Sequence, residues 1–440
     1  MMPRFAALLF LFASSANAQD LLQVYRDAKN YDAPYAAARH TLAAGLEKLP
    51  QGRSLILPTL NLSASATQTD LESRSRNTEV SPSFDRDFRS RGYSLSFSQP
   101  LYRKQNFLQY DQAEYQVKQA EAVFGQAGQD LIVRVAQAYF DVLAAQDTLA
   151  LVQAQKTAIA EQLAQAKRNF EVGTATITDT HEAQARFDLS AAQEIAARND
   201  LDSKRRALQQ ITGKEYAALK PLRAQVKLSP PNPANMQNWV EIAEKQGYPV
   251  LIQDSATEIA ALEARRNTAG HYPTLDLVAT HGYTTQSGSS VSGAGSNQTT
   301  NTIGLQFAVP LYAGGALNSR EREAAANYEK AKQDLENARR STALATRQSY
   351  LSVINGIAQV GALEQALVSS QSALDSNKLG YEVGVRINID VLNAQQQLFS
   401  TRRDLAVARY NTITSHLRLK AAAGSLREND LDEVNRALQP

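Results

Sequence analysis

Four short stretches of the chain place apolar residues at every second position. They lie near 58–69, 91–102, 273–285 and 302–311, with Asn, Ser, Thr, Gln and other small or polar residues at most of the alternate positions. This period is typical of a half-buried strand, and equally of a strand with one face to lipid and one to a water-filled lumen. A soluble antiparallel sheet and a membrane barrel are therefore both open on the pattern alone.

The connections within each strand pair favour the barrel. Residues 70–90 are polar and charged, and residues 286–301 are rich in Ser, Gly, Asn and Gln, so we expect two flexible external loops. Four strands are too few to close a barrel. If the strands form a barrel, several chains must build it.

The longest pattern is a heptad seam of apolar residues. From Leu131 to Phe170 these residues follow alternating steps of three and four, interrupted only at Lys156, which predicts a coiled coil. No proline occurs between Leu101 and Lys220, or between Leu311 and Gln439. A helix from Arg103 to Phe170 would be about 100 Å long at a rise of about 1.5 Å per residue.

Two matched segments interrupt these helical patterns, at 171–178 and 382–389. Each begins with a glycine suited to ending a helix, Gly173 or Gly384, and each is followed by an Asp near the start of the next helix, Asp179 or Asp390. We interpret both segments as turns of long helical hairpins and as the functional end of each hairpin.

The chain is an internal duplication. Pro58 and Leu60 correspond to Pro273 and Leu275, and the Pro-Leu-Tyr beginning at Pro100 returns at Pro310. The predicted organisation is a signal peptide at 1–18, a first repeat at 19–220, a proline-rich linker at 221–238, a second repeat at 239–424 and a loosely held, charged tail at 425–440.

Composition narrows the functional class. The 440 residues include 46 Lys and Arg against 44 Asp and Glu, and no cysteine. Near-neutral charge without basic clusters gives no reason to expect nucleic acid. Residues 1–18 resemble a secretory signal whose apolar run is too short to span a bilayer, so any membrane crossing is expected to use strands.

No catalytic or cofactor motif is recognisable. The five histidines are scattered without metal-ligand spacing, and Gly314-Gly315 lacks the rest of a dinucleotide fingerprint. We therefore expect no enzyme activity and no cofactor or metal.

With the signal, duplication, strand pairs, heptad helices and Val-Gly turns together, the chain resembles the outer-membrane efflux protein family. The resemblance covers nearly the whole mature chain. It is most specific in the segments beginning at Arg198, Gln209, Pro273, Pro310 and Tyr381. It implies a mainly α fold with a membrane β-barrel, in which each chain of a homotrimer gives four strands to a twelve-stranded outer-membrane barrel. A periplasmic α-helical coiled-coil barrel would continue it.

The resemblance also implies roles for residues at the turns. Matching positions for a gate are Thr178, Asp179, Tyr381 and Arg386. The family's glutamine partner of the tyrosine is here Arg168, which could rewire that bond toward Glu171. Of the family's two constriction aspartates, one matches Asp390 and the other falls on Asn393, which implies weaker cation selectivity. Candidates for adaptor docking are Val172, Gly173, Thr174, Val383, Gly384 and Val385.

The function implied is a passive, gated exit duct in the outer membrane with helices in the periplasm. Its partners would be a second and third copy of the chain, outer-membrane lipid, a periplasmic adaptor (membrane fusion) protein and, through it, an inner-membrane pump of RND, ABC or MFS type. Drug efflux and secretion of polypeptides both fit such a duct. The alternative from another class is a periplasmic coiled-coil scaffold without a pore.

Overall fold

The computed structural model describes residues 18–74, 76, 83–223, 226, 228–289 and 293–439. The signal peptide predicted at 1–18 lies almost wholly outside them. Two compact units divide the chain: one holds residues 1–40, 123–251 and 338–440, and the other holds 41–122 and 252–337. Each unit therefore takes parts of both sequence repeats.

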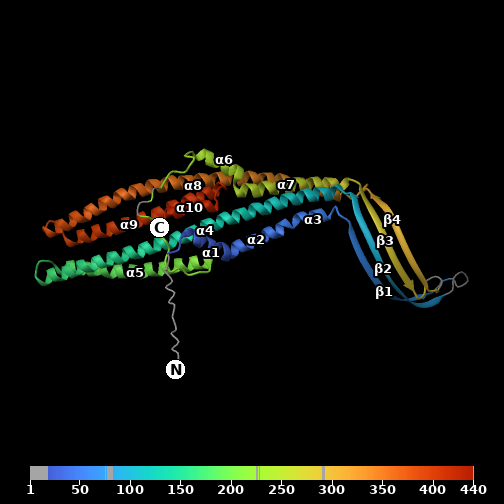
Figure 1. Ribbon diagram of the computed structural model, residues 1–440, viewed down its shortest axis with the longest axis horizontal. Coiled ribbons are helices and arrows are strands. Elements are labelled where there is room, and N and C mark those ends of the chain that lie inside the picture. Colours follow the sequence, from blue (N-terminus) through green and yellow to red (C-terminus); the bar gives the residue numbers. More distant parts are fainter. Residues whose placement is uncertain are drawn as a thin grey trace, which may run out of the picture. The chain divides into compact units, whose positions relative to one another are not determined.

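The elements alternate helices and strands as the duplication predicts (Figure 1). The first half contains α1 (Leu21–Tyr31), α2 (Ala33–Leu46), α3 (Lys48–Ser54), β1 (Thr59–Ser73), β2 (Phe84–Tyr102), α4 (Lys104–Glu171) and α5 (Ile177–Thr212). The second contains α6 (Met236–Gln246), α7 (Tyr248–Thr268), a short 3-10 helix (Ala269–His271), β3 (Thr274–Gln286), β4 (Ser296–Ala308), α8 (Ala316–Glu382), α9 (Asn388–Ala422) and α10 (Glu428–Arg436).

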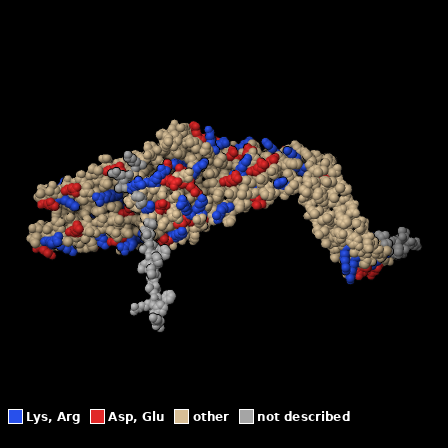
Figure 2. Space-filling model, viewed as in Figure 1, with Lys and Arg blue, Asp and Glu red and all other residues tan. Residues whose placement is uncertain are grey.

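The four strands form one antiparallel sheet in the order β1-β2-β3-β4. The register sets Leu60 opposite Phe97, Phe97 opposite Ala279 and Ala279 opposite Ile303, so one face of the sheet is apolar across all four strands. The neighbouring row, Asn61, Ser96, Thr280 and Thr302, belongs to the other face and is polar. On the side seen in Figure 2 the strands carry almost no charge, and charged residues gather at one end of them.

The strands are longer than the sequence indicated. β1 and β2 continue to Ser73 and from Phe84, and β4 begins at Ser296, so parts of the expected loops 70–90 and 286–301 are paired strand instead. Backbone pairing does not depend on an apolar face, which is why the polarity of these residues misled the prediction. β4 also ends at Ala308, short of the predicted 311.

The helices form the core of the first unit. The predicted seam of α4 is buried at Leu131, Val135, Val142 and Ala145, and a second stripe that includes Tyr139, Phe140 and Leu143 packs against α1, α9 and α10. Phe170, predicted as the end of the seam, is exposed because it lies beside the turn. The Tyr139 hydroxyl donates to the carbonyl oxygens of Lys220 (2.8 Å) and Gln19 (3.1 Å), which ties the linker and the start of the chain to α4.

The C-terminal segment is ordered, contrary to the loosely held tail that its charge suggested. α10 buries Leu431, and Leu438 is buried seven residues later. Several of its charged residues pair with other helices, Glu428 with Lys29 on α1 and Asp430 with Lys420 on α9, and a composition argument cannot distinguish such a helix from a free tail.

Among the described helices, α8 alone contains a window long and apolar enough to cross a membrane by length and composition. The core helix of a soluble protein can pass the same test, so this one window is weak evidence for a helical span.

Candidate functional site

The turn between α4 and α5 ends one helix and starts the next with standard caps. Gly173 adopts a left-handed conformation (φ 77°), and the amide of Thr174 donates to the Asn169 carbonyl at 2.8 Å. Thr176 caps α5: its hydroxyl accepts from the Asp179 amide (3.3 Å), while the Asp179 carboxylate accepts from the Thr176 amide (3.0 Å). Asp179 is thus engaged in its own helix end.

The turn between α8 and α9 repeats this design. Gly384 has φ 79°, and the amides of Val385 and Arg386 both donate to the Gly380 carbonyl, at 2.8 and 3.0 Å. The stem of Arg386 folds back over Gly380: a Cβ added there would lie 2.7 Å from the Arg386 Cγ. Gly380 therefore permits the position of the arginine, a role that the sequence did not suggest.

Tyr381 joins the hairpin of α8 and α9 to the hairpin of α4 and α5. Its hydroxyl accepts a hydrogen bond from Nδ2 of Asn169 on α4 at 3.2 Å. The position of the family's glutamine partner falls on Arg168, the residue before Asn169. Within the described part of the chain Arg168 is exposed and forms no ion pair with Glu171, so the rewiring suggested by the sequence does not occur in the single chain.

Arg386 pairs within its own turn. Its guanidinium lies 3.7 Å from the Asp390 carboxylate, at i and i+4, with the arginine mostly exposed. In the described chain no hydrogen bond or ion pair joins Arg386 or Tyr381 to Thr178 or Asp179. Of the four predicted gate residues, Asp179 and Arg386 interact locally, Tyr381 interacts with α4 and Thr178 is exposed, so the single chain does not bring the four together.

The residues predicted to dock a partner are exposed. Val172, Val383 and Val385 have 73%, 65% and 74% of their surface accessible, and a Cβ at Gly173 or Gly384 would meet no atom within 4 Å. Each turn therefore presents a short apolar tip to solvent. Exposure to water does not by itself explain why valine occupies these positions.

Asn393 has a partner that the sequence did not reveal. Arg186 on α5 donates from Nη2 to the Asn393 Oδ1 (2.9 Å) and from Nη1 to the Gln396 Oε1 (2.6 Å) on α9. Arg186 lies seven residues after Asp179, two helical turns along the same face. The seven-residue spacing from Asp179 was the signal for Arg186 that the sequence offered. It could not show that Arg186 contacts α9.

Beneath the turns, two apolar clusters hold the hairpins. Ile159, Leu163, Ala166, Ala183 and Leu392 join α4, α5 and α9, and Leu374, Val391 and Leu398 join α8 to α9. Asn388 and Gln395 interrupt the second seam. Both are buried, and the Asn388 Nδ2 and Gln395 Oε1 have no hydrogen-bond partner among the described residues.

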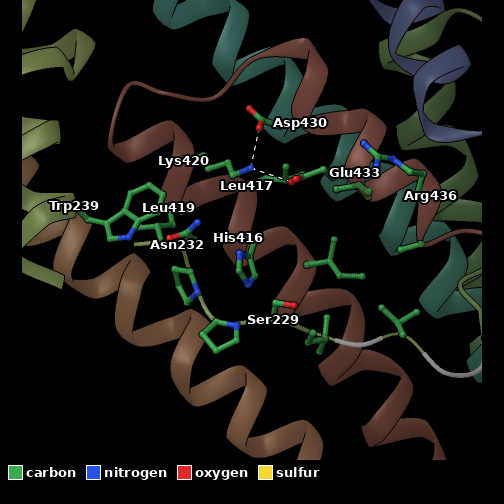
Figure 3. Close-up of a pocket in the computed structure, with 17 residues that line it drawn as sticks. Ser229, Asn232, Trp239, His416, Leu417, Leu419, Lys420, Asp430, Glu433 and Arg436 are labelled. Carbon is green, nitrogen blue, oxygen red and sulfur yellow. Dashed lines mark hydrogen bonds and ion pairs between the residues drawn. The ribbon is translucent and has the colours of Figure 1, made fainter. Parts of the chain in front are cut away.

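A cavity of about 560 Å³ lies elsewhere, between the linker, α6, α9 and α10 (Figure 3). Lys420 donates to Asp430 (2.8 Å) and Glu433 (3.2 Å) at its edge, and Trp239 closes one side while donating to the Pro233 carbonyl. None of the residues predicted at the turns lines it. Across the described residues, no group of three or more His, Asp or Glu side chains is arranged to hold a metal ion.

Comparison with known proteins gives a consistent picture. The family model described as outer membrane efflux protein matches residues 12–214 and 252–425. The chain is 34% identical over 435 residues to outer membrane protein TolC of Vibrio cholerae, covering 99% of this chain and 97% of that protein. It is 35% identical to TolC of Escherichia coli (97% and 86%) and 34% identical to the alkaline protease secretion protein AprF of Pseudomonas aeruginosa (98% and 89%).

Solved structures share the fold at lower identity. The outer membrane protein VceC of Vibrio cholerae superposes with a TM-score of 0.78 at 19% identity, covering 92% of this chain and 96% of that one. The Neisseria gonorrhoeae MtrE outer membrane channel, solved in its open state, gives 0.76 at 17% identity, with 93% and 90% covered.

Proposed function

Because the chain belongs to the outer membrane efflux protein family, we propose that three copies of it close one barrel and that their hairpin turns form its gate. The family places the protein in the outer membrane as an exit duct for efflux and type I secretion. A scaffold without a pore, the alternative that the sequence left open, is thereby set aside.

The sheet is the observation that carries the proposal of a shared barrel. It has an apolar face and a polar face, and within the described chain β1 and β4 each leave one edge unpaired. Unpaired backbone groups cannot remain in a lipid environment, so the edges must meet those of other copies. Three copies supply twelve strands, and an even-numbered antiparallel barrel is the form such sheets take in outer membranes.

The gate rests on weak bonds at the turns. The Asn169–Tyr381 hydrogen bond holds the hairpin of α8 and α9 to the hairpin of α4 and α5, and the exposed Arg386 is free to exchange Asp390 for a group on a neighbouring copy. An exposed ion pair contributes only about 0–1 kcal/mol. Three symmetric sets of such bonds can keep a gate closed and still yield when a partner docks.

The exposed valines support docking of a periplasmic adaptor at the turns. The adaptor would link the duct to an inner-membrane pump of RND, ABC or MFS type, which supplies the energy. Since the duct itself does no chemistry on its cargo, drugs and unfolded polypeptides are both compatible with it, and the pump selects between them.

Single-channel conductance in planar bilayers tests the gate. We expect a small conductance from the wild-type protein and a several-fold rise in the double variant Arg386→Ser/Tyr381→Phe. Asn169→Leu should raise it as well, because it removes the donor to the Tyr381 hydroxyl. Arg198→Ser is the matched control: its guanidinium pairs with Glu194 on the same helix (3.1 Å), so the conductance should not change.

Two results would count against the proposal in different ways. A wild-type protein that is already wide open would remove the gate and leave the duct. A purified oligomer that never conducts, in any variant, would remove the duct.

A further inference from the structure

Arg186 is held between two helices without being neutralised. Its guanidinium on α5 donates to the amide oxygens of Asn393 and Gln396 on α9, at 2.9 and 2.6 Å. No carboxylate lies within 4 Å of it in the described chain. Both acceptors are neutral amides. The contacts therefore fix the position of the guanidinium without neutralising its positive charge.

The two contacts also leave donors to spare. A guanidinium carries five N–H groups in a rigid fork, and α9 accepts from only two of its nitrogens. Asn393 and Gln396 are exposed on α9, and Arg186 is only partly covered. Its remaining N–H groups can therefore bind an anionic group that approaches from solvent.

Arg186 is also tied to the side of α9 that carries Asp390. Asn393 follows Asp390 by three residues, and residues at that separation are neighbours on one face of a helix. The carboxylate of Asp390 has its own cation, Arg386, at 3.7 Å. These contacts thus connect two guanidinium groups, Arg186 and Arg386, and one carboxylate, Asp390, at the first turns of α9.

We propose that Arg186 is a selectivity-determining residue of the duct and makes its narrow part favour anionic solutes. This rests on the proposed function, in which Asp390 and Asn393 line the duct. Rings of like charge in a narrow passage set the sign of the ions that pass. Three copies carry three Asp390 carboxylates against three Arg186 and three Arg386 guanidinium groups. The duct then prefers anions, such as carboxylates, phosphates and acidic polypeptide segments, rather than only having a weaker preference for cations.

The test measures the reversal potential of the purified protein in planar bilayers under a KCl gradient. The wild-type protein should prefer chloride. Arg186→Gln should shift the permeability ratio several-fold toward potassium, while Arg186→Lys, which keeps the charge and loses the fork, should retain the preference for chloride. Arg198→Gln removes the same charge from α5, but one already paired with Glu194, so it should leave the ratio unchanged.

Block by a multivalent anion gives a second readout. Hexacyanoferrate(II) should reduce the current through the wild-type protein and through Arg186→Lys, and several-fold less through Arg186→Gln. A residue that only braces α5 against α9 would change the stability of the oligomer without changing these ratios.

The possible outcomes distinguish a failure of the inference about Arg186 from a failure of the proposed duct. If the wild-type protein conducts and Arg186→Gln keeps its reversal potential and its block, Arg186 does not set selectivity and the duct stands. If Arg186→Lys shifts the ratio as far as Arg186→Gln does, the effect follows geometry rather than charge, and the inference is again wrong. If no variant conducts, the proposed duct itself fails.

Discussion

Two buried amides interrupt the apolar seam between α8 and α9. Asn388, Val391, Gln395 and Leu398 follow heptad spacing, and Asn388 and Gln395 are 2% and 4% exposed. Their unpartnered atoms lack a hydrogen bond within the described chain. Leaving a buried polar atom unpaired costs about 1–3 kcal/mol. The hairpin of α8 and α9 is therefore held together less tightly near its turn than a fully apolar seam would hold it, and such a weak seam suits the proposed movement of a gate.

We predict that Gln395→Leu tightens this hairpin. A gain of about 1 kcal/mol corresponds to roughly a fivefold change in an opening equilibrium. Hydrogen–deuterium exchange of the amides around Leu374 and Leu398 should slow by about that factor. Gln397→Leu makes the same change at an exposed position of α9 and should leave exchange as it is. Equal slowing in both variants would mean that burial of Gln395 is irrelevant.

At the scale of elements, the hairpin turns combine a fixed backbone with an open surface. Both glycines adopt a positive φ, where a side chain is strained, yet neither has an atom near the place a Cβ would occupy. Different substitutions at one of these glycines can thus distinguish the effect of backbone strain from the effect of side-chain bulk.

Gly384→Trp should abolish export and leave the oligomer intact, because the ring would hold a partner's helices away from the valine tips. Gly384→Ala imposes a similar backbone strain, of about 1–2 kcal/mol, without the bulk, and should keep most of the export. Drug susceptibility or secretion in cells, together with native electrophoresis of the oligomer, measures both effects. Loss of export in both variants would trace the defect to the backbone and remove the support for docking.

The elements that the sequence predicted well are those whose pattern is long and local. α4 was expected from Arg103 to Phe170 and runs from Lys104 to Glu171. A heptad seam without proline strongly favours one continuous helix over this range. The contact of Tyr381 with Asn169 was not predicted, because it depends on how two hairpins cross. Arg186 was missed altogether: its acceptors lie more than 200 residues away on α9, and one sequence holds no record of that approach.

At the scale of the whole molecule, segments near the two ends of the described chain are joined within the first unit. Glu428 on α10 accepts from the Tyr25 hydroxyl (3.0 Å) and from Lys29 on α1, and the Asn435 side chain donates to Asp20 (3.2 Å). His416, on the wall of the cavity in Figure 3, is enclosed by the linker and α10.

The C-terminal segment should loosen on acidification, in two steps. Burial lowers the pKa of His416 below its usual 6.5, against a hydrogen bond to the Ser229 backbone and the charge of Glu433, with Lys420 adding to the lowering. The hydrogen bond from Lys29 lowers the pKa of Glu428 below its usual 4.5. In both cases the unfolded state binds more protons, so the stability present above the usual pKa is lost as the pH falls through the folded one.

Exchange protection of α10, followed from pH 7 downward, measures this. His416→Gln should remove the step that begins below about pH 6.5, and Glu428→Gln the step that begins below about pH 4.5. Protection that stays constant from pH 7 to about pH 4.5 in the wild-type protein would contradict the assignment to His416, and protection that stays constant from about pH 4.5 down to about pH 3 would contradict the assignment to Glu428.

The two long helices differ by one residue, 68 in α4 and 67 in α8, and so do the shorter ones that return from them, 36 in α5 and 35 in α9. A seam with a seven-residue repeat keeps its facing residues only when whole repeats are inserted or deleted. An insertion in one hairpin alone would also shift its turn along the helix axis relative to the other turn. The contact between Asn169 and Tyr381 would then be lost. A change in hairpin length that keeps the seams and the Asn169–Tyr381 contact therefore needs matched insertions in all four helices, in increments of seven residues or about 10 Å.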